Sequence, residues 1–239
     1  LRVADIKERQ VPAGLAVSYD DKTLYAACPW GNSVCVMPLD APDQKKLLHL
    51  GANSYPYSAL PEPSGKRLYV SLWGKSSVAV LNLETGKVDS TWPTQSHPTE
   101  MLLTKDQRTL FVACANSNNV TVIDTETGKN LETISSGLFA TAANGSTPNS
   151  VSLSYDERVL LIANATNNNI AVIDVSERGR SRSLGFIPAG WYPTCARFNP
   201  HDGKIYVTNG KGLASKANRQ GPNPLNDPPK TTREYIGGL

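Results

Sequence analysis

The chain has 239 residues, of which 39% are hydrophobic and 19% are charged, and its formal net charge is +3. This length is sufficient for one all-β domain with a substantial core. The nearly balanced charge, with scattered lysines and no basic run interleaved with aromatics, argues against a nucleic-acid partner. No apolar span of about 18 residues occurs, so the sequence contains no transmembrane-helix pattern.

The first repeat of the chain occupies residues 11–54 and is preceded by a short segment, residues 1–10. That segment has the pattern of the outer strand of a preceding repeat, and it lacks both an initiating Met and a signal-peptide pattern. We therefore expect the chain to be a piece of a longer protein. Within the first repeat, alternating apolar runs separated by turn residues predict four strands, near 13–18, 23–28, 33–39 and 45–50.

Three further repeats follow at residues 55–96, 97–146 and 147–190. The repeat at residues 97–146 is the longest, because it carries an inserted loop, Ser135–Gly145, rich in Gly, Ala, Ser and Asn. The repeat at residues 147–190 shows the strand pattern most clearly. Its short apolar runs, Val151–Leu153, Val159–Ala163 and Ile170–Val175, are separated by polar, Asn-rich breaks. Asn tolerates the positive φ that tight hairpin turns require, so these runs are predicted to form one antiparallel sheet.

The last segment, residues 191–239, is predicted to be a partial repeat. It offers strands at 194–199 and 204–209 and then a Gly- and Pro-rich stretch, 210–230, that predicts a long loop. Residues Arg233–Leu239 are a candidate for a delayed third strand. Two closures remain open: the N-terminal strand completes this repeat in a five-bladed ring, or further blades lie outside the chain. We favour the second, because the partial repeat lacks both outer strands and the N-terminal run supplies one.

Two sequence features recur at the same intervals through all five repeats. A proline opens each repeat, and a Leu-Tyr-like pair marks its second strand; both recur at intervals of 44, 42, 50 and 45 residues by subtraction. The prolines are Pro12, Pro56, Pro98, Pro148 and Pro193. A four-stranded repeat of 40–50 residues is typical of a β-propeller blade, so we predict an all-β propeller of four-stranded antiparallel blades, with four full repeats and partial blades at both ends.

The repeats also resemble a known family. Tyr206-Val207-Thr208-Asn209 is the YVTN signature, and variants stand in register at Tyr69–Leu72, Phe111–Cys114 and Leu161–Asn164. With Val120–Asp124 and Thr127-Gly-Lys129 after them, the chain resembles the YVTN-repeat (YncE-like) β-propellers over essentially its whole length. The resemblance implies a propeller that usually has seven blades.

A narrower resemblance rests on Gly190–Thr194, Asn209–Gly212, Gly221–Pro224 and Tyr235–Gly238. These segments are similar to the propeller part of bacterial bifunctional proteins in which a YncE-like propeller precedes an alkaline-phosphatase-superfamily phosphoesterase. The resemblance implies an exported protein, periplasmic or at the cell surface, with the phosphoesterase domain as a possible partner. No residue here matches the metal ligands of that hydrolase, so its activity is not carried over.

Chain order predicts which loops share a face. Links between second and third strands emerge on the same side of a propeller as links from one blade to the next, and binding sites commonly form there. Aromatic rings beside amides and a few charges can hold a sugar, a peptide or another domain. The predicted binding face consists of Trp30, Asn32, Tyr55, Tyr57, Trp73, Lys75, His97, Glu100, Asn116, Asn149, Trp191, Tyr192 and Thr194.

Structural roles compete with this interpretation. The asparagines in 116–119 and 164–169 suit turn geometry, and loop aromatics often pack between blades. His97 and Glu100, three residues apart, are a candidate acid–base or metal pair, but a hydrogen-bonded structural histidine is the favoured interpretation because no further ligand clusters with them. No complete P-loop, G-x-S-x-G or H-E-x-x-H motif occurs, and we predict no catalytic residue and no metal.

The four cysteines fit no metal or redox motif, because no C-x-x-C is present. Cys28 and Cys114 share one column of the repeat, and Cys195 lies on a first strand. Cys28 and Cys35 flank a predicted hairpin turn, so a bridge between them stays open. The favoured interpretation is four free, mostly buried thiols.

Three functions remain. The favoured one is a non-catalytic binding or scaffolding module of an exported bacterial protein, which binds a partner domain or a cell-envelope ligand through the loop face. The second is a lactonase- or lyase-like propeller enzyme with a divalent cation in the central channel. The third is a surface-layer or spacer module without a small-molecule site.

Overall fold

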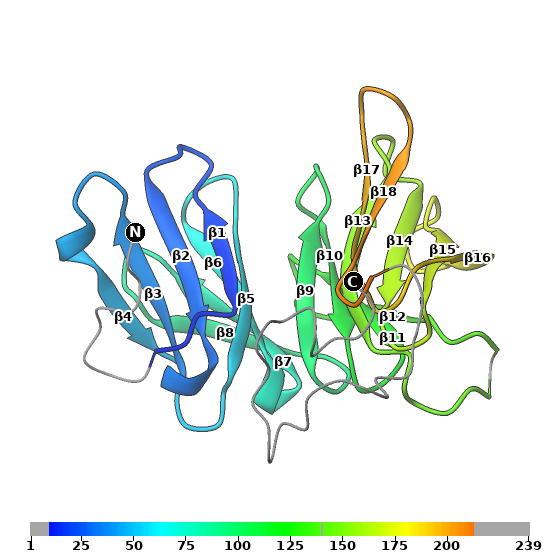
Figure 1. The fold of residues 1–239 in the computed structure, drawn as a ribbon. Helices are drawn as coiled ribbons and strands as arrows, with labels where there is room; N and C mark the ends of the chain where they lie inside the picture. Colours follow the sequence, from blue (N-terminus) through cyan, green and yellow to red (C-terminus); the bar gives the residue numbers. More distant parts are fainter. Residues whose placement is uncertain (1–9, 140, 213–239) are drawn as a thin grey trace, which may run out of the picture. The chain divides into compact units, whose positions relative to one another are not determined.

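The computed structural model describes residues 10–139 and 141–212 (Figure 1). These residues form four four-stranded antiparallel sheets and one two-stranded sheet, and the strands of every sheet pair in chain order. This arrangement confirms the predicted β-propeller fold. No helix in the described ranges is long and apolar enough to cross a membrane.

Each four-stranded sheet is one blade, and the two-stranded sheet is the described part of blade 5. Blade 1 contains β1 (Gly14–Val17), β2 (Thr23–Cys28), β3 (Ser33–Pro38) and β4 (Lys46–His49). Blade 2 contains β5 (Pro56–Pro61), β6 (Arg67–Leu72), β7 (Ser77–Asn82) and β8 (Val88–Pro93). Blade 3 contains β9 (Pro98–Leu103), β10 (Thr109–Cys114), β11 (Asn119–Asp124) and β12 (Asn130–Ser135). Blade 4 contains β13 (Pro148–Leu153), β14 (Val159–Asn164), β15 (Asn169–Asp174) and β16 (Arg182–Pro188), and blade 5 contains β17 (Pro193–Phe198) and β18 (Ile205–Asn209).

The predicted strands agree with these bounds to within a few residues. Three short 3₁₀ turns accompany them: η1 (Pro29–Gly31), η2 (Pro42–Gln44) and η3 (Trp73–Lys75). The predicted outer strand at residues 1–10 lies outside the described residues except for Gln10, which is buried and not in a strand. The predicted strand at Arg233–Leu239 and the 210–230 loop beyond Gly212 also lie outside them.

The chain divides into two compact units, Leu1–Ser135 and Ser136–Leu239. Blades 1, 2 and 3 belong to unit 1, and blades 4 and 5 belong to unit 2. That all five repeats join in one ring, and how that ring closes, stays a prediction.

The middle strands of each blade carry the core. All six residues of β10 are buried, because both faces of the sheet are covered, as expected for a near-continuous apolar run. In unit 1, one cluster joins Tyr25 and Val34 of blade 1 to Leu68 of blade 2, and a second joins Tyr69 of blade 2 to Leu110 of blade 3. In unit 2 a third cluster packs Leu161 of blade 4 against Ala196 of blade 5. Burial between adjacent blades is therefore what holds each unit together.

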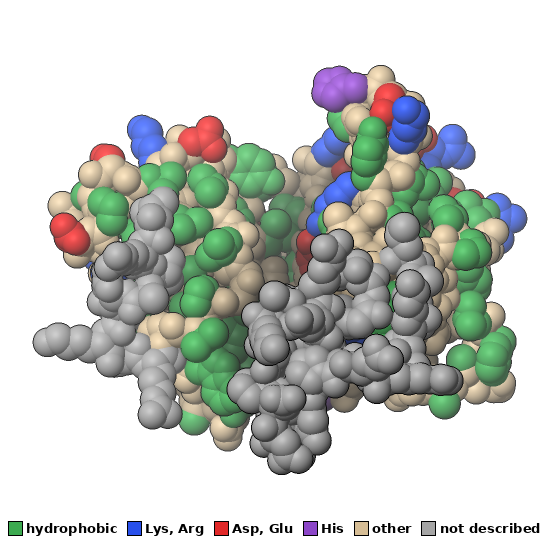
Figure 2. All heavy atoms as spheres, in the orientation of Figure 1, with side chains coloured by type: hydrophobic (Ala, Val, Ile, Leu, Met, Phe, Trp, Pro, Cys, Tyr) green, Lys and Arg blue, Asp and Glu red, His purple; other side chains and the backbone are tan. Residues whose placement is uncertain are grey.

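The surface is mixed in character. Figure 2 shows acidic and basic side chains scattered among hydrophobic and polar ones on the visible face. This distribution agrees with the nearly balanced charge of the sequence.

An unusual backbone conformation recurs before blades 2, 3, 4 and 5. The residue before the opening proline has positive φ: Tyr55 (43°), His97 (57°), Thr147 (55°) and Tyr192 (61°). A residue before proline ordinarily prefers extended backbone, and positive φ is uncommon outside glycine. In blades 2, 4 and 5 the pairing register shifts directly after this proline, and in blade 3 it shifts nearby, between Val112 and Cys114 on β10. Such bulges change the direction of side chains at the rims of β-structures. Residues with strained backbone tend to cluster at functional sites.

All four cysteines are free thiols, with Cys28, Cys35 and Cys114 buried and Cys195 half-buried. Cys35 pairs with Ala26 and Cys28 with Ser33, so the two cysteines flank the β2–β3 turn without lying opposite one another. Burial raises the pKa of Cys28 to about 11, and the neighbouring Cys35 adds to the rise. Burial also raises the pKa values of the Cys35 and Cys114 thiols.

These thiols should differ in reactivity. The thiolate is the reacting form, so the three buried cysteines are expected to resist a thiol reagent in the native protein. Titration with Ellman's reagent near pH 8 should therefore label Cys195 first and all four thiols only after denaturation. Cys195→Ser is the control, which should remove the fast phase. If two or more thiols of the native protein reacted rapidly, this result would contradict the burial of Cys28, Cys35 and Cys114.

Candidate ligand-binding face

Two sets of loops are predicted to share a face: the links between second and third strands, and the links from one blade to the next. The hydrogen bonds of individual blades agree with this prediction. The turn after β6 is hydrogen-bonded to the link before β5, through Trp73 N to Tyr55 O at 3.1 Å. In blade 3 the Ala115 N–H donates to His97 O at 2.9 Å in the same way. The side chains of both loop sets therefore emerge at one end of each blade, which we call the loop face.

Asn32 ties blade 1 to the link that leads into blade 2. It has φ 49°, in the left-handed region, and follows η1. Its Oδ1 accepts hydrogen bonds from Ser54 N (2.9 Å), Ser54 Oγ (3.2 Å) and Tyr55 N (3.3 Å). In unit 2, Asn168 Oδ1 accepts from Tyr192 N at 2.9 Å. Asn168 lies in the run 164–169 that is predicted to suit turn geometry, whereas Asn32 is predicted only as a binding-face residue. Each of the two side chains holds the strained residue that opens the next blade.

Four rings form a continuous row on the loop face of unit 1, which we call the aromatic row: Trp30, Tyr55, Trp73 and His97. Trp30 and Tyr55 meet edge to face with centroids 6.3 Å apart, and Tyr55 meets Trp73 in the same way at 6.2 Å. Trp73 stacks on His97 with centroids 3.7 Å apart and an interplanar angle of 17°. Trp30 is 69% exposed and Trp73 is 37% exposed. Both indoles therefore expose surface that a ligand can reach, and one face of Trp73 is covered by His97.

His97 closes the row with an unsatisfied polar atom. Its Nδ1 is buried and has no hydrogen-bond partner among the described residues. Buried polar atoms are normally paired, so this ring nitrogen is an exception, and the exposed surface of the row is supplied by its neighbouring indoles. Glu100 is half-buried on β9. Within residues 10–139 and 141–212, no three His, Cys, Asp or Glu side chains are grouped to hold a metal ion.

The other predicted site residues of unit 1 flank the row. Tyr57 is 39% exposed on β5, in the bulge that follows Pro56. Lys75 Nζ donates to Leu50 O at 3.3 Å, so its ammonium group lies over the link between blades 1 and 2. Asn116 is exposed in the turn after β10. The structure thus brings the unit 1 part of the predicted face together around the loops of blades 1 to 3.

The unit 2 part forms a second cluster. Lys211 Nζ lies 4.5 Å from the Tyr192 ring centroid and 5.4 Å from that of Trp191, in cation–π range. Thr194 is exposed, and its Oγ1 lies 3.0 Å from Thr208 Oγ1. Asn149 Oδ1 is buried without a partner in the described part of the chain. Lys211 is not among the residues of the predicted face, although chain order assigns both Asn209–Gly212 and Gly190–Thr194 to loops of that face.

A family model matches part of the chain. Residues 60–136, which run from the end of β5 to just beyond β12, match the lactonase family, described as a seven-bladed β-propeller. No sequence among the curated proteins matches the chain.

Several solved structures share the fold. The hydrazine synthase of Kuenenia stuttgartiensis is 23% identical with a TM-score of 0.68, and the match covers 87% of this chain and 58% of that one. The periplasmic gluconolactonase PpgL of Pseudomonas aeruginosa is 20% identical with a TM-score of 0.71, covering 83% and 63%. The virginiamycin B lyase of Staphylococcus aureus is 16% identical with a TM-score of 0.69, covering 85% and 64%.

These likenesses concern the fold. The chain spans between 58% and 64% of the length of these three structures, at identities below 25%. One fold supports many functions, so function has to be argued from the site. The lactonase match and the structural neighbours together show that this chain is built as a β-propeller of four-stranded blades.

Proposed function

We propose that the chain is a binding propeller, and that the aromatic row of unit 1 holds its ligand or partner. The observation that carries this is the run of touching rings from Trp30 to His97, with both indoles exposed. Exposed aromatic side chains bury large areas at little conformational cost and dominate many interfaces. The row is held by hydrogen-bonded loops, so it is pre-organised before binding.

The chemistry of the row suits a ligand with flat apolar faces and polar edges. A sugar ring or an extended peptide can stack on the indoles, while the ammonium group of Lys75 offers a polar contact at the side. A cell-envelope glycan or a neighbouring domain of the parent protein, such as the phosphoesterase suggested by the sequence resemblance, meets this description. The YncE-like relationship and a periplasmic or cell-surface location remain parts of this proposal.

Trp73→Ala is the decisive variant. Trp73 lies in the middle of the row, so its loss should separate Tyr55 from His97 and weaken binding at least tenfold, or about 1.4 kcal/mol. The measurement is tryptophan fluorescence titration against a panel of soluble cell-wall oligosaccharides, and of the downstream domain if the gene encodes one.

The matched control is Tyr19→Ala. Tyr19 is 63% exposed and lies in the β1–β2 turn, away from the loop face. It should leave binding unchanged. If no probe binds, or if Trp73→Ala and Tyr19→Ala bind with equal affinity, the aromatic row is not the binding site. That result would favour a spacer module without a ligand site.

A lactonase-like enzyme is the second candidate, favoured by the family match over residues 60–136 and by the gluconolactonase among the structural neighbours. His97 and Glu100 lie inside the matched residues. Purified protein, with and without added divalent cation, would be assayed for hydrolysis of gluconolactone by proton release. Turnover that falls in both His97→Gln and Glu100→Gln would establish this candidate and displace the binding module.

A further inference from the structure

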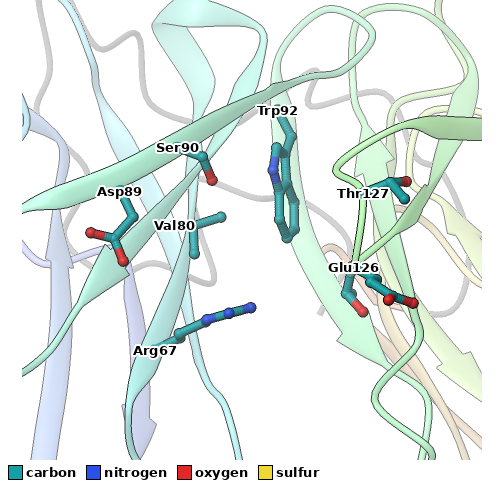
Figure 3. A pocket seen from close by; sticks show the side chains of 8 residues that line it. Arg67, Val80, Asp89, Ser90, Trp92, Glu126 and Thr127 are labelled. Carbon is teal, nitrogen blue, oxygen red and sulfur yellow. The ribbon is translucent and has the colours of Figure 1, made fainter.

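A cavity lies away from the aromatic row, between blades 2 and 3 of unit 1. It is a cavity of about 240 Å³ between β8 and the turn that joins β11 to β12. Figure 3 shows Arg67, Asp89 and Ser90 on one side, Glu126 and Thr127 on the other, and the Trp92 indole between them. Turns between third and fourth strands emerge opposite the loop face, so this cavity is separate from the proposed ligand face.

Two parts of the cavity wall are held in place, one by packing and the other by hydrogen bonds. Trp92 is 8% exposed, and its ring packs on Tyr69 with centroids 5.5 Å apart. Gly128 has φ 69°, and a side chain there would collide with Trp92 Nε1, so the turn of blade 3 seats directly against the indole. Asp124 Oδ1 accepts from the backbone N–H groups of Glu126 (3.1 Å) and Thr127 (2.8 Å), which fixes the opposite wall.

The charges around the cavity are not neutralised by one another. Among the described residues, no ion pair joins Arg67 to Asp89 or to Glu126, although all three line the cavity. Arg67 lies beside the Tyr69 hydroxyl; burial raises the pKa of Tyr69, and Arg67 counteracts part of the rise. The cavity therefore presents a cation and two anions to the same space, with Val80 and Trp92 as an apolar floor.

We propose that this cavity binds a small zwitterion of the α-amino-acid type. The ligand carboxylate would pair with the planar guanidinium of Arg67, which suits a carboxylate better than an ammonium group does. The ligand ammonium group would donate to the carboxylates of Asp89 and Glu126, with Ser90 and Thr127 as further partners. The ligand side chain would lie on Val80 and Trp92. Pockets for drug-sized ligands run from roughly 300 Å³ upward, so the volume limits the ligand to a small metabolite.

Leucine and its two half-ligands test the proposal. Isocaproate keeps the apolar chain and the carboxylate, and isoamylamine keeps the chain and the ammonium group. Leucine should raise the midpoint of thermal unfolding with increasing concentration and quench Trp92 fluorescence, and neither half-ligand should do so at the same concentration. Absence of any leucine effect at about 10 mM, or equal effects from a half-ligand, would overturn it.

Variants locate the site. Arg67→Gln should weaken leucine binding about tenfold or more, because a charged hydrogen bond is lost, and Glu126→Gln should weaken it less. Lys66→Gln removes a neighbouring exposed charge that does not line the cavity, and it should bind leucine as the wild type does. Unchanged melting without ligand confirms that the variants fold. Trp73→Ala should also leave leucine binding intact, which separates this site from the aromatic row. Leucine affinity that survives Arg67→Gln would refute the assignment.

Discussion

Trp92→Ala is expected to destabilise unit 1 by about 3–5 kcal/mol, the range for removing a buried tryptophan. Trp92 is the one tryptophan that does not lie on the predicted face: it belongs to β8, faces blade 3 and is buried against Tyr69. Its ring fills the space that Gly128 leaves open, so truncation creates a cavity between two blades. The measurement is urea unfolding followed by far-UV circular dichroism, with a loss of about 10 °C in the melting midpoint as a second readout.

A nearby position and a double mutant separate this effect from general damage. Val88→Ala lies on the same strand at an exposed position and should cost well under 1 kcal/mol. Gly128→Ala in the wild type combines a collision with Trp92 and backbone strain, and in the Trp92→Ala background only the strain remains. The two changes should therefore be non-additive. Additive costs would show that the blades do not meet at this pair.

The repeat structure was predictable because its signals are local. Pro56, Pro98, Pro148 and Pro193 each begin the first strand of a blade, and the apolar pairs that start at Leu68 and Leu110 are buried in the second strands. The hydrophobic pattern fixes these elements, and chain order alone assigns the loops to one face. The burial of Cys28 and Cys114 followed from the column of the repeat that they share.

The geometry of the site was not predictable, because it depends on pairs far apart in sequence. The rule for residues before proline predicts extended backbone at His97, yet φ is 57° there, and the imidazole stacks on Trp73. Asn32 is predicted as a residue of the binding face, yet its Oδ1 accepts a hydrogen bond from Ser54, 22 residues along the chain, and so ties two loops together. The cavity beside Trp92 arises where a turn of one blade meets the outer strand of another, so no single stretch of sequence carries it.

Asn32 gives the second large effect, because three hydrogen bonds and a left-handed backbone meet at one residue. Ser54 is fully buried, so loss of the Oδ1 acceptor would leave its N–H unsatisfied. An unsatisfied buried donor costs about 1–3 kcal/mol, and a side chain other than Gly, Asn or Asp costs about 1–2 kcal/mol more at left-handed φ.

Three substitutions at Asn32 separate these contributions. Asn32→Asp keeps the acceptor and tolerates the backbone, so it should be the mildest. Asn32→Gly keeps only the backbone conformation, so its free energy of unfolding should fall by about 1–3 kcal/mol. Asn32→Ala loses both the acceptor and the tolerance of left-handed φ, so it should be the most destabilised, by about 2–5 kcal/mol. Equilibrium unfolding gives the order, and wild-type stability in Asn32→Gly would mean that the hydrogen bonds to Ser54 and Tyr55 contribute nothing.

The same series links the fold to binding. Tyr55 stands between Trp30 and Trp73, and its backbone is held by Asn32, so releasing it should disturb the middle of the aromatic row. Asn32→Gly is therefore expected to weaken binding at the loop face under conditions in which the variant remains folded, although Asn32 itself need not touch the ligand. Asn168→Gly releases one hydrogen bond at Tyr192, in unit 2, and should leave binding at the aromatic row unchanged. Equal losses of affinity in both variants would mean that general loosening of the blades, and not the position of Tyr55, controls binding.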